Sequence, residues 1–215
     1  MKDRPIETHR PAFAESPLDE ANLDADPFAQ LERWLDDAMA RDDILEPNAM
    51  ALATVGKDGH PSARMVLLRG LDERGLTFFS NYESRKALEL GASPAAALLF
   101  YWEPLHRQVR IEGDVARIAP GESDAYFAQR PRGHRLGAWA SPQSRLVADR
   151  AELEAAQLKY ETKFEGRDVD RPPFWGGYRL NPNRFEFWQG RLNRLHDRIA
   201  YDRAPEGWRI VRLAP

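Results

Sequence analysis

Arg194, His196 and Arg198 stand at every second position of one short segment, and all three side chains can carry positive charge. If residues 194–201 form a strand, the two-residue period of a strand places these side chains on one face, about 6 to 7 Å apart. Such a row of cations is suited to binding an anion. Trp188, shortly before it, would add an aromatic wall to that site. The alternative interpretation is a solvated strand face, or one whose cations pair with Asp and Glu across strands.

Two further basic groups are candidates for binding phosphate. Arg85 and Lys86 open a helix expected over residues 84–90, where a phosphate would meet both side chains and the free backbone N–H groups of the first turn. Most such pairs are merely solvated. Arg64 and Arg69 lie five residues apart on one expected strand, so they share a site only if the strand ends or bulges between them.

The segment 126–144 is rich in Arg, Gly and Pro, too rich for a plain helix, and we expect a loop that wraps an anion. A basic surface linker is the alternative. The chain has no cysteine, which excludes disulfides, thiolate metal sites and a cysteine nucleophile. Its five histidines show no two-histidine metal spacing, and no dinucleotide-binding, Walker or nucleophile-elbow motif is present, so we expect no metal.

The composition is typical of a globular protein with one sizeable core. The chain has 215 residues, 42% of them hydrophobic and 30% charged, and a net charge of −3 that gives no global attraction for nucleic acid. No apolar run approaches the roughly 20 residues of a membrane span, and the N-terminus shows no export signal. We therefore expect a soluble, cytoplasmic protein without nucleic-acid or membrane partners.

The order of expected elements predicts a mainly β fold with peripheral helices. Residues 1–25 are too poor in large apolar side chains to join a core and are expected to form a flexible arm, followed by a single domain over residues 26–215. An amphipathic helix begins at Asp26-Pro27, and further helices are expected over 84–90, 120–129 and 146–164. Strands are expected over 50–55, 62–69, 76–80, 95–102, 108–118, 174–180, 184–189, 194–201 and 208–213. Short strands joined by tight turns favour an antiparallel barrel.

Read in order, the basic and aromatic motifs resemble those of the pyridoxine (pyridoxamine) 5′-phosphate oxidase family. The resemblance covers residues 26–215. The matching segments are Arg64-Met65-Val66-Leu67-Leu68, Ser84-Arg85-Lys86, Arg107-Gln108-Val109, Arg130-Pro131-Arg132, Gly137-Ala138-Trp139, Phe174-Trp175-Gly176-Gly177, Phe187-Trp188-Gln189-Gly190 and Arg194-Leu195-His196-Asp197-Arg198. So many matches in order are very unlikely to arise by chance.

The resemblance implies an antiparallel, FMN-binding split β-barrel that forms a homodimer, with two FMN sites at the dimer interface. By matching position it assigns FMN binding to Arg64, Met65, Val66, Leu67, Leu68, Phe79, Ser80, Arg85, Lys86, Gln108, Gln143, Ser144, Trp188 and Arg198. It assigns the substrate to Arg69, Tyr126, Arg130, His134, Arg194, Leu195 and His196, with Arg194 and His196 as the catalytic residues. Both ligands are phosphate monoesters, which fits two separate arginine groups.

The implied reaction oxidises pyridoxine or pyridoxamine 5′-phosphate to pyridoxal 5′-phosphate. A hydride passes from C4′ of the substrate to the flavin, and O₂ reoxidises the flavin and gives H₂O₂. The flavin carries the redox chemistry, and the protein contributes orientation and electrostatics. Arg194 would lie nearest the reacting carbon, and His196 would orient the pyridine ring or its O3′.

Three features depart from the family's usual pattern and bear on substrate affinity and preference. Arg69 stands where lysine is usual, and His134 stands where serine is common. The N-terminal segment lacks the Arg-Arg-x-Tyr type sequence of some members. Two other functions are alternatives: a related flavoenzyme of the phenazine-pathway type, and a carrier of FMN or pyridoxal phosphate without catalysis.

Overall fold

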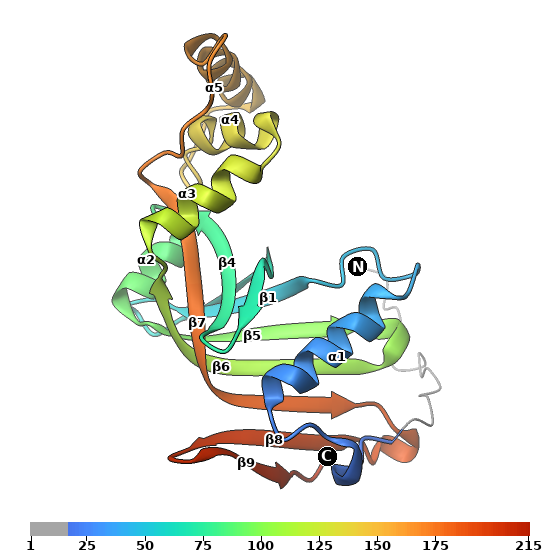
Figure 1. The fold of residues 1–215 in the computed structure, drawn as a ribbon. Helices are drawn as coiled ribbons and strands as arrows, with labels where there is room; N and C mark the ends of the chain where they lie inside the picture. Colours follow the sequence, from blue (N-terminus) through green and yellow to red (C-terminus); the bar gives the residue numbers. More distant parts are fainter. Residues whose placement is uncertain (1–16) are drawn as a thin grey trace, which may run out of the picture. The chain divides into compact units, whose positions relative to one another are not determined.

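The structure, a computed structural model, describes residues 17–215, and within them it confirms the mainly β fold with peripheral helices (Figure 1). The strands are β1 Ala49–Val55, β2 Pro61–Leu67, β3 Gly70–Asp72, β4 Gly75–Asn81, β5 Ala95–Trp102, β6 Arg107–Arg117, β7 Trp175–Gln189, β8 Asp197–Ala204 and β9 Gly207–Arg212. The helices are α1 Pro27–Met39, α2 Arg85–Ala92, α3 Pro120–Gln129, α4 Arg132–Ala140 and α5 Arg150–Lys163. Three short 3₁₀ turns lie at Glu20–Asn22, Glu103–Leu105 and Leu192–Arg194. None of these helices is long and apolar enough to cross a membrane.

The strands hydrogen-bond in the order β2-β1-β5-β6-β7-β4-β3, and β8 pairs with both β7 and β9. The described residues form two compact units. The first unit contains the described residues up to Pro47 together with 99–110 and 184–215, and the second contains 48–98 and 111–183. Strands β5, β6 and β7 contribute residues to both units. The assignment of residues 26–215 to one domain stays a prediction.

In the first unit, α1 supplies the apolar face that covers the C-terminal strands. The helix begins as predicted: Pro27 occupies its first position, and the Asp26 carboxylate accepts from the Phe28 N–H at 3.1 Å. Its buried rings meet rings of β7 edge-on, Phe28 against Phe185 and Trp34 against Phe187, each with centroids 5.2 Å apart. These contacts anchor the half of β7 that continues to Trp188.

Residues 17–25, the described part of the expected arm, contact the C-terminal strands of the same unit. Leu18 is buried, and its N–H donates to the Asp197 carboxylate at 3.1 Å. Arg212 donates to the Leu18 carbonyl and pairs with Glu20 at 2.6 Å. Composition does not reveal these polar contacts. The rest of the expected arm, residues 1–16, lies outside the described residues.

In the second unit, antiparallel pairs hold the strands that surround α2. The β1–β2 hairpin pairs Leu52 with Arg64, and β4 pairs with the first part of β7. Gly176 on β7 allows a close approach, because a Cβ there would lie 2.0 Å from the Tyr82 hydroxyl. Helices α3, α4 and α5 follow β6, and their apolar side chains form a cluster with β7 made of Phe127, Leu136, Phe164, Val169 and Trp175.

Helix α4 and strand β7 both differ from what we expected from the sequence. Residues 132–140 form α4 inside the segment 126–144, which we expected to be a loop. Gly133 and Gly137 cost roughly 1 kcal/mol each relative to alanine in a helix, but the burial of Leu136 within the cluster offsets this cost.

The second correction concerns β7, where we expected two strands separated near Pro182. The structure has one strand, Trp175–Gln189. Proline has a backbone φ that a strand accepts and only lacks a donor. Close packing supports the strand here, since a Cβ at Gly113 would lie 2.1 Å from the carbonyl oxygen of Asn181.

Candidate functional site

The second unit contains a cavity of about 1190 Å³ that brings together most of the predicted site residues. Side chains from β2, β4, α2, α3, α4 and the turn after α4 line it. The predicted residues that line it are Arg64, Met65, Val66, Leu67, Arg69, Phe79, Ser80, Arg85, Lys86, Tyr126, Arg130, His134, Gln143 and Ser144. Leu68, also predicted to bind FMN, does not line the cavity and is buried in the core.

Lys86 is a buried cation whose hydrogen-bond partners in the described structure are all neutral. Its Nζ donates to the hydroxyls of Ser80 at 3.1 Å and Ser84 at 3.3 Å, and to the Gln143 side-chain oxygen at 3.3 Å. Burial, followed by the charge of Arg64, lowers the pKa of Lys86 below its usual value, while Glu89 opposes this shift. An ammonium held in this way is stabilised by a bound anion.

The N-terminus of α2 adds backbone donors beside Lys86. Ser84 is the N-cap residue, but its hydroxyl donates to the Asn81 carbonyl at 2.7 Å and does not cap the helix. The first-turn N–H groups therefore lack a side-chain acceptor, and the helix dipole favours negative charge there. Gln143, which accepts from Lys86, and Ser144 lie in a turn that lines the same cavity, where Ser144 has a left-handed φ of 70°.

Arg130, like the exposed Arg69, also lines this cavity without an acidic partner among the described residues. It follows α3 directly, and its guanidinium lies over the Trp175 ring at 4.6 Å from the centroid. Its Nη1 is buried without a hydrogen-bond partner in the described structure. Burial lowers the pKa of Arg130, Tyr126 opposes the shift, and the like charge of Arg69 lowers it further. Arg130 and Arg69 are thus like charges close enough to repel.

An aromatic wall stands next to Arg130. The rings of Phe79 and Tyr126 stack with centroids 3.8 Å apart and planes 12° apart. Trp175 continues the stack at 5.4 Å from Phe79, also at 12°. These three nearly parallel rings make one wall of the cavity apolar and aromatic, which suits a planar aromatic ligand that carries a phosphate.

Arg64 and Arg69 share the cavity because β2 ends at Leu67, before Arg69. This is the strand end that the sequence required if the two were to meet. Arg69 is exposed, its N–H donates to the Thr77 carbonyl at 2.8 Å, and its side chain extends from the end of the strand. His134 lies exposed in the first turn of α4 and lines the cavity together with Arg130 and Pro131.

The remaining predicted residues lie in the first unit: Gln108 on β6, Trp188 on β7, Arg194 and Leu195 in the 3₁₀ turn and its end, His196 after it, and Arg198 on β8. The expected strand over 194–201 was wrong at its start, because β8 begins at Asp197. Arg194 has a φ of 62°, a left-handed conformation that a strand does not contain. Arg194 and His196 therefore do not share a strand face with Arg198.

His196 has a fixed ring orientation. Its Nδ1 accepts from the Arg191 N–H at 3.0 Å, and its ring lies 4.6 Å from the Trp188 ring, tilted by 40°. Burial and then the charge of Arg194 lower the pKa of His196, while Asp197 opposes the shift. The neutral ring therefore carries its proton on Nε2, which makes that atom a hydrogen-bond donor.

Arg198 is held by a buried acid. Glu186 on β7 accepts from Arg198 at 2.8 Å and from Arg110 at 2.7 Å. Gln189 anchors the end of β7 through the carbonyls of Leu105 and His106, at 3.1 and 3.2 Å. The backbone that presents Trp188 is thus fixed on both sides.

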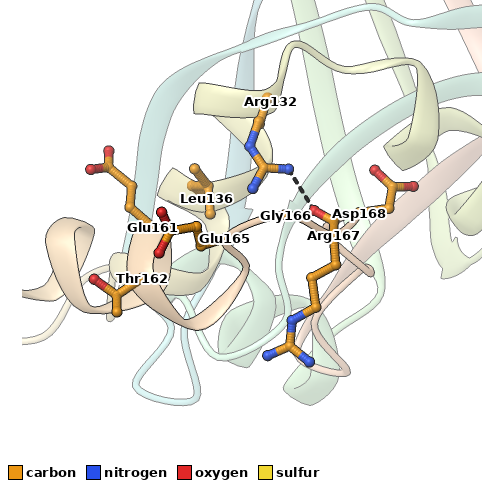
Figure 2. Close-up of a pocket in the computed structure, with 8 residues that line it drawn as sticks. All are labelled: Arg132, Leu136, Glu161, Thr162, Glu165, Gly166, Arg167 and Asp168. Atoms are coloured by element: carbon orange, nitrogen blue, oxygen red, sulfur yellow. Dashed lines mark hydrogen bonds between the residues drawn. The ribbon is translucent and has the colours of Figure 1, made fainter.

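A second hollow in the same unit, of about 720 Å³, is not a continuation of this site (Figure 2). Figure 2 shows Arg132 directed at the backbone of Arg167, and the two Nη groups of Arg132 donate to the carbonyls of Arg167 at 2.9 Å and Phe164 at 2.7 Å. Arg132 therefore closes the C-terminal end of α5, and its charge is committed to structure.

Sequence reasoning gave no role to Trp175, which lines the cavity, or to Glu89, which contacts two of its arginines. Trp175 forms part of the aromatic wall. Its segment was among those that resemble the family, but the sequence assigned it no role in the site. Glu89, buried on α2, contacts Arg64 and Arg85. Its four-residue spacing from Arg85 was the available signal, since such pairs face each other on a helix. No pattern in the sequence links Glu89 to Arg64.

Comparison with known proteins gives consistent matches over nearly the whole chain. The family model described as pyridoxamine 5′-phosphate oxidase matches residues 36–163, and that described as pyridoxine 5′-phosphate oxidase C-terminal dimerisation region matches residues 175–215. A pyridoxine/pyridoxamine 5′-phosphate oxidase of Cupriavidus taiwanensis is 59% identical over 199 residues, covering 92% of this chain and 93% of the relative. One of Rubrobacter xylanophilus is 56% identical over 206 residues, covering 96% and 94%.

Solved structures agree with the fold. The structure of PhzG from Burkholderia lata 383, in complex with tetrahydrophenazine-1-carboxylic acid, has a TM-score of 0.88 and 32% identity, covering 95% of this chain and 100% of that one. A pyridoxamine 5′-phosphate oxidase-related, FMN-binding protein of Nostoc punctiforme has a TM-score of 0.67 at 20% identity, covering 84% and 95%, and supports the fold alone. The split-barrel prediction is confirmed, and the chain belongs to the pyridoxine/pyridoxamine 5′-phosphate oxidase family.

Proposed function

We propose that this protein is an FMN-dependent oxidase that converts pyridoxine and pyridoxamine 5′-phosphates to pyridoxal 5′-phosphate. O₂ is the acceptor and H₂O₂ a product, and with the amine substrate water is consumed and ammonia is released. One observation carries the proposal beyond family membership. Three cations that line a single cavity beside the aromatic wall, Lys86, Arg130 and Arg69, have no acidic partner among the described residues. Two phosphate monoesters attached to planar rings, FMN and the substrate, match that arrangement.

Lys86, the first turn of α2 and the neighbouring arginines would hold the FMN phosphate. Lys86 is the cation that most needs an anion, because its present partners are neutral and it is buried. Arg64 and Arg85 add charge, and Ser80, Gln143 and Ser144 add polar groups around the same space. Phosphate would replace these weak partners with charge-assisted hydrogen bonds.

Arg130 would bind the substrate phosphate, with Arg69, Tyr126 and His134 beside it. The orphaned Nη1 of Arg130 fits an anionic oxygen, and a phosphate would also relieve the repulsion between Arg130 and Arg69. Arginine at position 69 offers a planar fork of donors where lysine would offer a point charge. The aromatic wall would exclude water from the bound rings.

We further propose that the protein acts as a homodimer in which residues 175–215 of a second copy complete each site. The match to a C-terminal dimerisation region supports this, since Trp188, Arg194, His196 and Arg198 all lie within it. If so, FMN retention should depend on the dimer. Flavin content measured across dilution, together with the oligomeric state by light scattering, tests this, and a monomer that retains FMN would contradict it.

When bound, FMN supplies the redox chemistry by accepting a hydride from the substrate and passing electrons to O₂. His196 would contribute a neutral imidazole with Nε2–H as donor to O3′ on the pyridine ring of the substrate, because Arg191 already donates to Nδ1. Arg194 would lie nearest the reacting carbon and help to position it. The backbone strain at its left-handed φ is typical of residues held for a function.

Two other functions are compared with this one. PhzG, a structural relative, was solved with tetrahydrophenazine-1-carboxylic acid, and an enzyme of that type would act on a ligand without phosphate. The unpaired Arg130 beside Arg69 favours a phosphorylated substrate. A carrier of FMN or pyridoxal phosphate would bind ligand without turnover.

The deciding experiment uses the purified full-length protein. We expect a flavin absorbance spectrum, and we expect each of pyridoxine and pyridoxamine 5′-phosphate to bleach it without O₂ and to yield H₂O₂ with O₂. Unphosphorylated pyridoxine is the matched control and should react far more slowly. Bound flavin without H₂O₂ from either substrate would support the carrier, and equal rates with unphosphorylated pyridoxine would argue against the phosphate site.

A further inference from the structure

Glu89 is a buried carboxylate at the back of the candidate FMN phosphate site, with only 6% of its surface exposed. One oxygen, Oε2, accepts from the Thr54 hydroxyl at 2.6 Å, the Ser62 hydroxyl at 2.7 Å and Arg64 Nη2 at 3.0 Å. The other, Oε1, accepts from Arg85 Nε at 2.8 Å. Both oxygens are therefore committed to donors from β1, β2 and α2.

The same network fixes Arg64. Its Nη1 donates to the Leu52 carbonyl at 3.1 Å and to the Thr54 hydroxyl, and its Nη2 donates to the Ser62 hydroxyl as well as to Glu89. A guanidinium has five N–H donors, so four are used and the Nε–H remains. Arg64 is thus oriented before any ligand arrives.

The charges around Glu89 also balance those of a phosphate. Arg64, Arg85 and Lys86 carry three positive charges around one cavity, and Glu89 carries one negative charge. Together they leave two positive charges, equal in size to the charge of a phosphate monoester dianion. Glu89 also favours the charged form of Lys86.

A purely structural role does not account for this placement. Burying a carboxylate costs several kcal/mol unless it is fully paired, and an apolar residue of similar volume often packs at least as well. An ordinary ion pair within α2, between Glu89 and Arg85, would not require a third partner, Arg64, on strand β2. The buried carboxylate of Glu89 pairs with two cations that line the same cavity, Arg64 and Arg85.

We propose that Glu89 is a positioning residue for the cofactor, which orients Arg64 and Arg85 toward the phosphate of FMN. The inference rests on the proposed function, because it takes FMN as the ligand of this cavity. Glu89 does not bind the phosphate itself, because two negative charges repel and its oxygens already accept from four protein donors. Its contribution is therefore made through the arginines.

Replacing Glu89 by glutamine has two opposing effects. Removing a negative charge near a phosphate would strengthen binding if nothing moved. Glutamine, however, puts an N–H₂ group where one oxygen stood, and every neighbour of that oxygen is a donor, so at least one arginine must move away. We expect the loss of orientation to win, because a displaced arginine forfeits a charge-assisted contact that is worth about 10-fold or more in affinity.

The test compares FMN with riboflavin, which lacks the phosphate. Each flavin is titrated into flavin-free, full-length Glu89→Gln protein, and binding is followed by quenching of flavin fluorescence. We expect FMN affinity to fall about 10-fold or more while riboflavin affinity stays within about twofold. Glu83→Gln is the matched control, since Glu83 is exposed and pairs with Arg145 at 3.4 Å. It should change neither affinity.

Three other results of these titrations would each contradict one of the claims above. Unchanged or tighter FMN binding by Glu89→Gln would show that charge dominates over orientation and would refute the positioning role. Equal losses for FMN and riboflavin would show a structural role only. If wild-type protein binds neither flavin, the proposed function itself fails. Should Glu89→Gln not fold, Glu89→Asp carries the same comparison, because it keeps the charge but shortens the reach to the arginines.

Discussion

The guanidinium of Arg130 lies over the Trp175 ring at 4.6 Å, and its Nη1 has no hydrogen-bond partner among the described residues. Cation–π contact with the ring offsets part of the cost of desolvating the charge, but it leaves the buried N–H donor unsatisfied. Such a group destabilises the free protein and gains most when an anion binds. Arg130 should therefore lower the stability of the ligand-free protein while raising its affinity for an anion.

Arg130→Met should weaken substrate binding without weakening the fold. The variant keeps a long side chain on Trp175 but removes the charge, so we expect kcat/KM for pyridoxine 5′-phosphate to fall by about 10- to 150-fold. The melting temperature without substrate should stay equal or rise, because an unsatisfied buried cation is gone. Arg132→Met is the control: it loses the contacts to Phe164 and Arg167, so it should lower the melting temperature and leave KM alone. The reverse pattern would refute the assignment.

Lys86→Met should act on the cofactor and leave the substrate site intact. Loss of a charge-assisted contact predicts an FMN affinity about 10- to 150-fold weaker, and added FMN should restore most activity. Because burial and Arg64 lower the pKa of Lys86, its charge is lost at a lower pH than that of a free lysine. Wild-type FMN affinity should therefore fall as pH rises through this lowered pKa, and the variant should lack that fall. A parallel pH profile in both proteins would contradict the role.

Parts of the site were predictable from local pattern. The pair Arg85 and Lys86 was recognisable because a helix start follows from Ser84 and the apolar spacing after it. The convergence of Arg64 and Arg69 was stated conditionally, and the end of β2 at Leu67 satisfies the condition. These features depend on residues close together in the chain, so helix propensity and the spacing of side chains along a helix or strand are enough to predict them.

Features that depend on tertiary packing were not predictable. Helix α4 is stabilised by the burial of Leu136 in a cluster with Phe127, Phe164 and Trp175, which composition cannot reveal. The left-handed φ of Arg194 has no sequence signal, because glycine or asparagine is expected there and arginine is not. Glu89 and Arg64 are 25 residues apart, and only the fold brings them together.

The contacts of residues 17–24 predict a difference between two truncations. Deleting residues 1–24 removes the buried Leu18 and the pairing of Glu20 with Arg212, whereas deleting residues 1–16 leaves both. Burial of one leucine contributes roughly 1.5 to 3 kcal/mol, which corresponds to about 3 to 12 °C in melting temperature for a chain of this size. Differential scanning fluorimetry of the FMN-loaded proteins measures this. Equal melting temperatures would show that the segment adds nothing to stability.

Arg194 offers the sharpest separation of binding from chemistry, because its backbone and side chain can be tested apart. Arg194→Ala removes the guanidinium but keeps the strained φ of 62°, whereas Arg194→Gly removes the same side chain and accepts that φ at little cost. We propose that the side chain positions the reacting carbon, so both variants should keep FMN and reduce it more slowly in anaerobic stopped-flow experiments with pyridoxine 5′-phosphate. Extra FMN should not restore either rate. If glycine alone restores the rate, the backbone matters and the side chain does not, and wild-type reduction by Arg194→Ala would remove Arg194 from the site.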